Sequence, residues 1–210
     1  MQKLIELAGE IENEEIRKKV IDLIKNPKLS NPDFQKYPKE DLEKVRTPFS
    51  VSDTGIVERE IVNHTATNTE LCLQIADTFE KNYGVKVNRG VLVAGSLLHD
   101  IMKVYEWTID EEGDPAPSGL TLDHVLLGVA ELYARGFPEE VIHVVAATQG
   151  ERTPPKSLEA LILHYVDTLT SLTEFFTGSK KQKAQMPLIV LDEETFKKMK
   201  EETLKNKSLF

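Results

Sequence analysis

The fold of this chain is decided by residues 94–103, which read Ala-Gly-Ser-Leu-Leu-His-Asp-Ile-Met-Lys. The apolar run continues upstream to Asn88, a residue that suits a helix N-cap, so a helix is predicted over residues 88–105. Such a helix delivers the adjacent side chains of His99 and Asp100 to one buried point. Imidazole nitrogen and carboxylate oxygen together suit a divalent metal, and a carboxylate can bridge two ions.

Helical periodicity dominates the sequence on both sides of this run. Further helices are predicted over residues 57–82, 120–135, 138–148 and 157–176. Gly84, Gly136 and Gly178 suit helix ends, and Pro138 suits a first helical turn. Short β pairs fit in the loops, but no long period-two run is present. The predicted fold class is all-α, a helical bundle.

The two ends of the chain differ from this central part. Residues 5–24 have the spacing of one amphipathic helix, and residues 26–55 contain four prolines with room for a helix over 39–45. Near the C-terminus a further amphipathic helix is predicted over residues 192–205. Three parts are therefore predicted: an N-terminal helix and proline-rich arm (1–56), a main domain (57–178) and a C-terminal helical extension (179–210).

Asp167 is the second feature that indicates a metal. It ends the run Leu161-Ile162-Leu163-His164-Tyr165-Val166-Asp167, which is too apolar to hold an unpaired carboxylate cheaply. Burying a lone charge costs several kcal/mol by common experience, so a counter-ion is expected. With His64 on an earlier helix, the candidate ligands are His64, His99, Asp100 and Asp167.

This order of residues resembles the HD superfamily of metal-dependent phosphohydrolases over about residues 57–176. The sequence His99-Asp100-Ile101-Met102-Lys103 is similar to that family's usual His-Asp-Ile-Gly-Lys, with Met102 where glycine is common. The resemblance implies an HD-domain helical bundle that holds a divalent transition metal (Fe, Mn, Ni, Co or Zn). It also implies that the metal activates water to attack phosphorus.

The resemblance gives several residues a role in catalysis or substrate binding. Asp100 is expected to bridge ions or to orient the attacking water, and Lys103 to meet the anionic substrate. From their positions alone, five residues before His64 and in the loop after Gly150, Arg59 and Arg152 are candidate phosphate anchors, although most arginines only solvate a surface.

For a second metal site, the sequence offers some of the expected ligands and lacks others. Residues 119–128 are similar to a helix that carries a further ligand in members with extra histidines, so His124 is a candidate. Those members have a His-His pair where this chain has Thr148-Gln149. His143 is a candidate substitute or a core histidine. For His164, a structural or supporting role is favoured.

Composition limits the choice of partner and compartment. The net charge of -9 argues against a protein that grips long nucleic acid. Neither a signal peptide nor a membrane-spanning segment is indicated, and one cysteine rules out an internal disulfide, so a cytoplasmic protein is expected. A homodimer is compatible with the sequence but not indicated by it.

The function favoured by these features is hydrolysis of a phosphoester in a small phosphorylated metabolite, a nucleotide or a cyclic phosphodiester. Similarity to small archaeal phosphodiesterases makes a pterin 2′,3′-cyclic phosphate the specific case to test first. The alternatives are a nuclease of the HD type, an HD-fold oxygenase with an iron pair, and a non-catalytic, metal-containing ligand-binding or scaffold protein.

Overall fold

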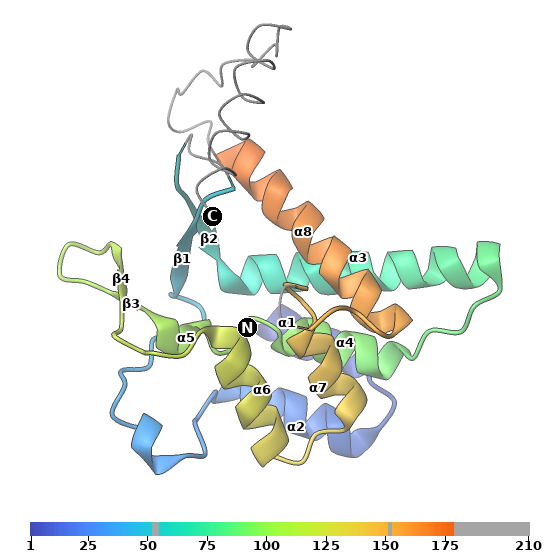
Figure 1. Cartoon of the computed structure of the whole chain (residues 1–210), viewed down its shortest axis with the longest axis horizontal. Coiled ribbons are helices and arrows are strands. Elements are labelled where there is room, and N and C mark those ends of the chain that lie inside the picture. Colours follow the sequence, from blue (N-terminus) through green and yellow to red (C-terminus); the bar gives the residue numbers. More distant parts are fainter. Residues whose placement is uncertain (52–54, 151–152, 179–210) are drawn as a thin grey trace, which may run out of the picture.

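The computed structural model describes residues 1–51, 55–150 and 153–178, and within them helices dominate (Figure 1). The helices are α1 (Gln2–Leu7), α2 (Glu14–Lys25), α3 (Ile61–Tyr83), α4 (Arg89–Leu98), α5 (Lys103–Glu106), α6 (His124–Ala134), α7 (Glu139–Ala146) and α8 (Leu158–Gly178), with short 3-10 turns at η1 (Ala8–Glu10) and η2 (Pro32–Phe34). Two antiparallel hairpins pair β1 (Arg46–Phe49) with β2 (Val57–Glu60), and β3 (Trp107–Ile109) with β4 (Pro115–Pro117). The all-α prediction is confirmed.

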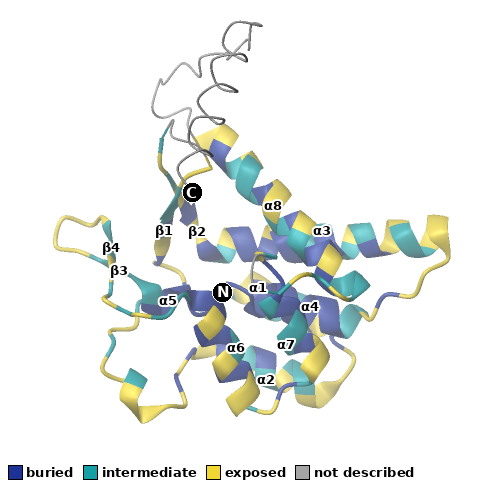
Figure 2. Cartoon of the chain, in the orientation of Figure 1, coloured by how far each residue is buried: buried dark blue, intermediate teal, exposed yellow. Residues whose placement is uncertain are grey.

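Helix α4 forms the centre of the core, with α2, α3, α7 and α8 packed around it. All of residues 91–98 are buried, and the helix is dark throughout this part in Figure 2. Gly95 allows the close approach of α7, because a Cβ atom there would lie 2.3 Å from Val144 Cγ1. Ser96 is polar, and its hydroxyl lies 3.0 Å from that of Thr69 on α3. The residues that follow α4 are therefore attached to the best-packed element of the fold.

The prediction of one helix over residues 88–105 is wrong at its C-terminal half. Asn88 caps α4 as expected, its side chain accepting from the Val91 amide, but the helix ends at Leu98. His99 and Asp100 then lie in a tight turn before α5. On a continuous helix two adjacent side chains point about 100° apart. His99 keeps helical backbone angles (φ -58°, ψ -36°), so the ligand atoms of the two residues meet through the reach of their side chains.

The N-terminal helix predicted over residues 5–24 is also interrupted. Helix α1 and turn η1 end before Ile11, which is extended, and Asn13 then caps α2 by accepting from the Ile16 amide. This bend buries Leu4, Ile11 and Leu23 in one core. Helix α1 packs on α3 and α2 packs on α4, so the first 25 residues are part of the main core.

Two other predicted elements differ in the structure. Residues 39–45 form a turn rather than a helix, because Asp41 accepts from the Glu43 amide and the side chains of Leu42 and Val45 are buried. Residues 57–60 form strand β2 rather than the start of α3, paired with β1 in the register Phe49↔Val57. This hairpin turns Arg59 inward.

The remaining predicted helices are present with shorter N-terminal ends. Gly84 and Gly136 both have the left-handed backbone expected of residues that end helices, with φ of 64° at each. Asp123 caps α6, so that helix begins at His124 rather than near residue 120. No helix in the described ranges is long and apolar enough to cross a membrane. The helix predicted over 192–205 lies outside the described residues.

Candidate metal centre

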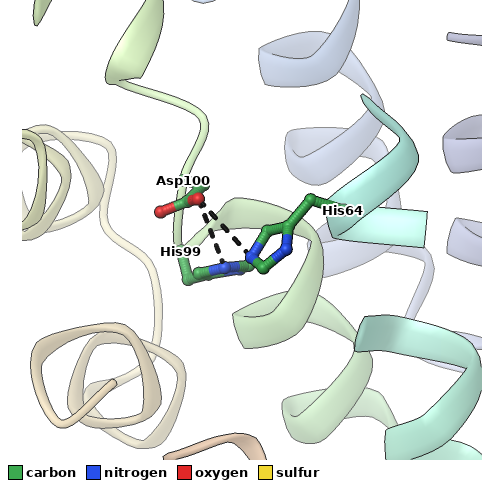
Figure 3. A group of neighbouring side chains, drawn as sticks. All are labelled: His64, His99 and Asp100. Carbon is green, nitrogen blue, oxygen red and sulfur yellow. Dashed lines mark ion pairs between the residues drawn. The ribbon is translucent and has the colours of Figure 1, made fainter. Parts of the chain in front are cut away.

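His64, His99 and Asp100 come together at the C-terminal end of α4 (Figure 3). Each offers one ligand atom, and these atoms all lie within 4.8 Å of one another. Asp100 Oδ2 is 3.8 Å from His64 Nε2 and 3.6 Å from His99 Nε2. All three side chains are buried, so two imidazoles and a carboxylate face one shared space.

Asp167 on α8 closes the other side of this space. Its Oδ1 lies 2.9 Å from His64 Nε2 and 3.6 Å from His99 Nε2. Burial raises the pKa of Asp167, but the neighbouring imidazoles of His64 and His99 hold it far below its usual range. The structure thus brings together all four residues predicted as ligands of the first metal.

Two buried atoms in this cluster have no hydrogen-bond partner: His99 Nε2 and Asp100 Oδ2. Lys103 Nζ lies 2.9 Å from that oxygen, but its approach is not at a hydrogen-bonding angle. Leaving a buried polar atom unpaired costs about 1–3 kcal/mol. Nitrogen and oxygen atoms that face one space without hydrogen-bond partners are what a divalent cation needs, so the residues present fit a metal.

The orientation of the His99 ring supports this fit. Its Nδ1 lies 2.7 Å from the backbone carbonyl of Ser96 and donates to it. A neutral ring with its proton on Nδ1 carries a lone pair on Nε2. His99 therefore presents an acceptor, not a proton, to the space it shares with Asp100.

The sequence did not reveal Glu174, the most important supporting residue for His64. Glu174 Oε1 lies 3.0 Å from His64 Nδ1, and Arg59 Nε donates to the other carboxylate oxygen at 2.7 Å. Burial lowers the pKa of His64, but the carboxylates of Asp167 and Glu174 raise it above its ordinary value. The sequence did contain a signal, because Glu174 is seven positions after Asp167 and that spacing places both on one face of a helix.

His124, at the start of α6, approaches Asp100 from the opposite side. Its Nε2 is 3.3 Å from Asp100 Oδ1, and its Nδ1 is 2.8 Å from Glu106 Oε2. Asp100 therefore has one oxygen toward His64 and His99 and the other toward His124. Although burial raises it, Lys103, His99 and His124 hold the pKa of Asp100 well below its usual range.

The other predicted site residues lie apart from this cluster or outside the described residues. His143 Nε2 accepts from the Lys156 amide and lines a separate surface pocket with Asn88 and Glu139. His164 Nδ1 lies 2.7 Å from the Thr148 carbonyl oxygen, which matches the supporting role expected of it. Arg152 is outside the described residues.

Comparison with known families agrees with this geometry. The model of the HD domain matches residues 61–172, a range that begins with α3 and ends within α8. The chain belongs to the HD domain family. The matched range includes all four side chains around the shared space and also His124.

Two curated relatives of this HD protein differ in their sequence identity to it and in the share of their length that it matches. The dihydroneopterin 2′,3′-cyclic phosphate phosphodiesterase of Methanocaldococcus jannaschii is 42% identical over 174 residues, which are 81% of this chain and 69% of that protein. The 3′-5′ exoribonuclease YhaM of Geobacillus sp. (strain WCH70) is 27% identical over 155 residues, which are 67% of this chain and 48% of the exoribonuclease. The HD protein thus matches about half of the exoribonuclease. No solved structure matches it significantly.

Proposed function

We propose that this HD protein is a metal-dependent phosphodiesterase that opens a small cyclic phosphodiester, with dihydroneopterin 2′,3′-cyclic phosphate as the first candidate substrate. The observation that carries the proposal is the convergence of buried ligand atoms of His99 and Asp100, neither of which has a hydrogen-bond partner, with His64. Identity of 42% to a phosphodiesterase of that substrate, over most of both chains, supports the substrate class.

The residues that would hold the metal are His64, His99, Asp100 and Asp167. A divalent cation there supplies positive charge that polarises a phosphoryl oxygen and lowers the pKa of water. The mixture of imidazole and carboxylate accepts several first-row metals, so iron, manganese, nickel, cobalt and zinc all remain candidates.

Two further side chains can act directly on a phosphodiester bound beside this cluster. Lys103 is 11% exposed at its side chain, and its ammonium group can stabilise the negative charge that builds up on the phosphate oxygens. His124 can hold a proton near Asp100, because burial lowers its pKa but hydrogen bonds to Asp100 and Glu106 raise it above the ordinary value. Opening a cyclic ester leaves an alkoxide that needs such a proton.

A panel of phosphoesters tests the proposal. Metal-loaded wild-type protein and a His99→Ala variant would be incubated with dihydroneopterin 2′,3′-cyclic phosphate, a nucleoside 2′,3′-cyclic phosphate, a linear phosphomonoester and a labelled oligoribonucleotide. We expect the wild type to convert the cyclic esters to monoesters and the variant to be inactive. The conversion is measured by ³¹P NMR. Equal traces from both proteins on every substrate would refute the proposal.

The oligoribonucleotide arm addresses the second candidate function, a nuclease, which the similarity to the exoribonuclease favours. The net charge of -9 and the match to about half of the exoribonuclease argue against it. Cleavage of the oligoribonucleotide without hydrolysis of the cyclic esters would decide for the nuclease.

A further inference from the structure

The His64 ring has a carboxylate at each nitrogen. Asp167 Oδ1 lies 2.9 Å from Nε2, and Glu174 Oε1 lies 3.0 Å from Nδ1. The His64 side chain is 0% exposed, so no solvent competes for either position. The two carboxylates therefore compete for the single proton of a neutral ring.

Only one of these carboxylates belongs to the ligand cluster. Asp167 also faces His99, whereas Glu174 lies on the far side of the His64 ring. A cation held by His64 and Asp167 needs the lone pair of Nε2. The ring must then keep its proton on Nδ1, where Glu174 is the acceptor.

Asn68 on α3 also indicates that the His64 proton is on Nδ1. Its Nδ2 lies 3.0 Å from His64 Nε2 and 3.1 Å from Asp167 Oδ1, and the hydroxyl of Thr170 donates to its Oδ1 at 2.5 Å. Turning the amide over would place its oxygen against the Asp167 carboxylate. The NH2 group of Asn68, which can only donate, therefore faces Nε2. This orientation requires Nε2 to be an acceptor that carries no proton.

Glu174 is itself fixed by a buried arginine. Arg59 Nε donates to Glu174 Oε2 at 2.7 Å, and its Nη2 donates to Ser171 Oγ at 2.7 Å. The guanidinium carbon also lies 4.1 Å from the centroid of the Phe49 ring, and the Arg59 side chain is 6% exposed. Because arginine has donors and no acceptor, the oxygen that faces Arg59 must be an acceptor.

We infer that Glu174, oriented by Arg59, is a positioning residue that keeps the His64 proton on Nδ1 and leaves Nε2 free for the metal. Arg59 acts through Glu174 and is not a phosphate anchor. The inference rests on the metal site of the proposed function, but not on its substrate.

In a Glu174→Gln variant, Arg59 fixes the orientation of the new amide, and that orientation is unfavourable for His64. The amide oxygen must face Arg59, so the NH2 group faces His64 Nδ1. The ring then accepts at Nδ1 and carries its proton on Nε2, against the metal. Removing such supporting hydrogen bonds typically lowers metal affinity about 10–100-fold, and we expect a loss of this size in the affinity for zinc.

Adding Arg59→Met to Glu174→Gln should restore part of this affinity. The methionine side chain has no N–H donor that needs an acceptor, so the new amide can turn its oxygen toward His64 Nδ1. A purely structural role predicts the opposite, because a second buried change normally adds to the damage of the first. We expect the double variant to bind zinc several-fold more tightly than Glu174→Gln alone.

The measurements are zinc affinity by competition with a chromophoric chelator, and the proton position on His64 from long-range ¹H–¹⁵N spectra of zinc-loaded protein. Glu140→Gln is the matched control, because Glu140 is exposed on α7. Circular dichroism of each metal-free variant checks that it is folded.

Three results would overturn the inference: zinc affinity of Glu174→Gln within about threefold of wild type, a double variant weaker than the single one, or a His64 proton on Nε2 in the wild type. If the double variant does not fold, the single variant and the spectra still decide. Wild-type protein that binds no zinc would overturn both this inference and the proposed function. Wild-type protein that binds zinc and shows the expected loss in Glu174→Gln, yet hydrolyses no phosphoester, would overturn only the proposed function.

Discussion

His64 and His124 approach Asp100 from opposite sides, and each has a glutamate at Nδ1. The difference lies behind the glutamates. Glu174 on α8 is bound by Arg59, whereas Glu106, the last residue of α5, has no ion pair with a lysine or arginine within the described ranges. The hydrogen bond to His64 therefore comes from a glutamate held by a buried arginine, and the one to His124 does not. A preset ring suits a permanent metal ligand, and an adjustable ring suits a group whose proton moves during the reaction.

The largest effect is expected where the two sides meet, at Asp100. In Asp100→Asn, one of the two oxygens is replaced by an amide NH2 group, which cannot bind a cation, on either the His64 and His99 side or the His124 side. Loss of a ligand should exceed the roughly 10–100-fold effect of supporting residues, so we expect a greater loss of both zinc affinity and hydrolysis. Equilibrium dialysis and the ³¹P assay measure the two. Retention of both would contradict the central position given to Asp100.

Alanine substitutions of the two histidines separate the two sides. His64→Ala should lower zinc affinity by more than about 100-fold, and His124→Ala by no more than about 10-fold while still reducing turnover. Both variants are compared in the same dialysis and kinetic experiments. Equal losses of zinc affinity would show that His124 is as much a ligand as His64.

Glu106→Gln tests whether His124 needs only a hydrogen-bond acceptor at Nδ1. Because no arginine fixes this position, the amide can rotate and offer its oxygen to His124 Nδ1. We therefore expect less than about a tenfold change in turnover, smaller than the effect of Glu174→Gln. Glu106→Ala, which offers no acceptor, is the matched control and should be worse. A Glu106→Gln variant as damaged as Glu106→Ala would mean that charge, not orientation, matters at this position.

The smallest effect concerns the stability of the metal-free protein. The pKa of both His64 and His124 is raised above the ordinary 6.5 in the folded state. Each proton is bound more tightly by the folded than by the unfolded chain, so its stabilisation is full below the unfolded pKa and is lost as pH rises through the folded pKa. Between about pH 6 and 8 we expect the melting temperature to fall by a few degrees.

Glu174→Gln should flatten that fall more than Glu106→Gln does, because the fixed amide cannot stabilise the charged ring. Thermal melts in chelator at a series of pH values measure it. A melting temperature that rises over this interval would contradict the assignment of raised histidine pKa values.

Much of the ligand cluster could be predicted from the sequence. His99 and Asp100 are adjacent within an apolar run, and Asp167 ends another, so burial of both acids required a counter-charge whatever the details of packing. The turn after Leu98 was not predictable from periodicity, because apolar residues resume at Ile101 and Met102 with helical spacing from Leu98.

The supporting residues depend on packing that short-range patterns do not contain. Glu174 contacts a histidine 110 positions away, and Arg59 reaches it from a short strand whose pairing is settled only in the folded chain. Arg59 was therefore a candidate phosphate anchor in the sequence, whereas in the structure its Nε and Nη2 donate to Glu174 and Ser171. The bend at Ile11 was missed for a related reason: helical spacing hid the capping residue Asn13.

The burial of residues 91–98 in α4 has a consequence for how the cluster can open. Amide protons of such a helix exchange with solvent only when the whole domain unfolds, whereas short elements near the surface exchange through local openings. His99 is the residue that directly follows α4, so its side of the cluster should survive as long as the fold does. Helix α5, which carries Glu106, has only four residues, so hydrogen exchange should show weaker protection at Glu106 than in α4.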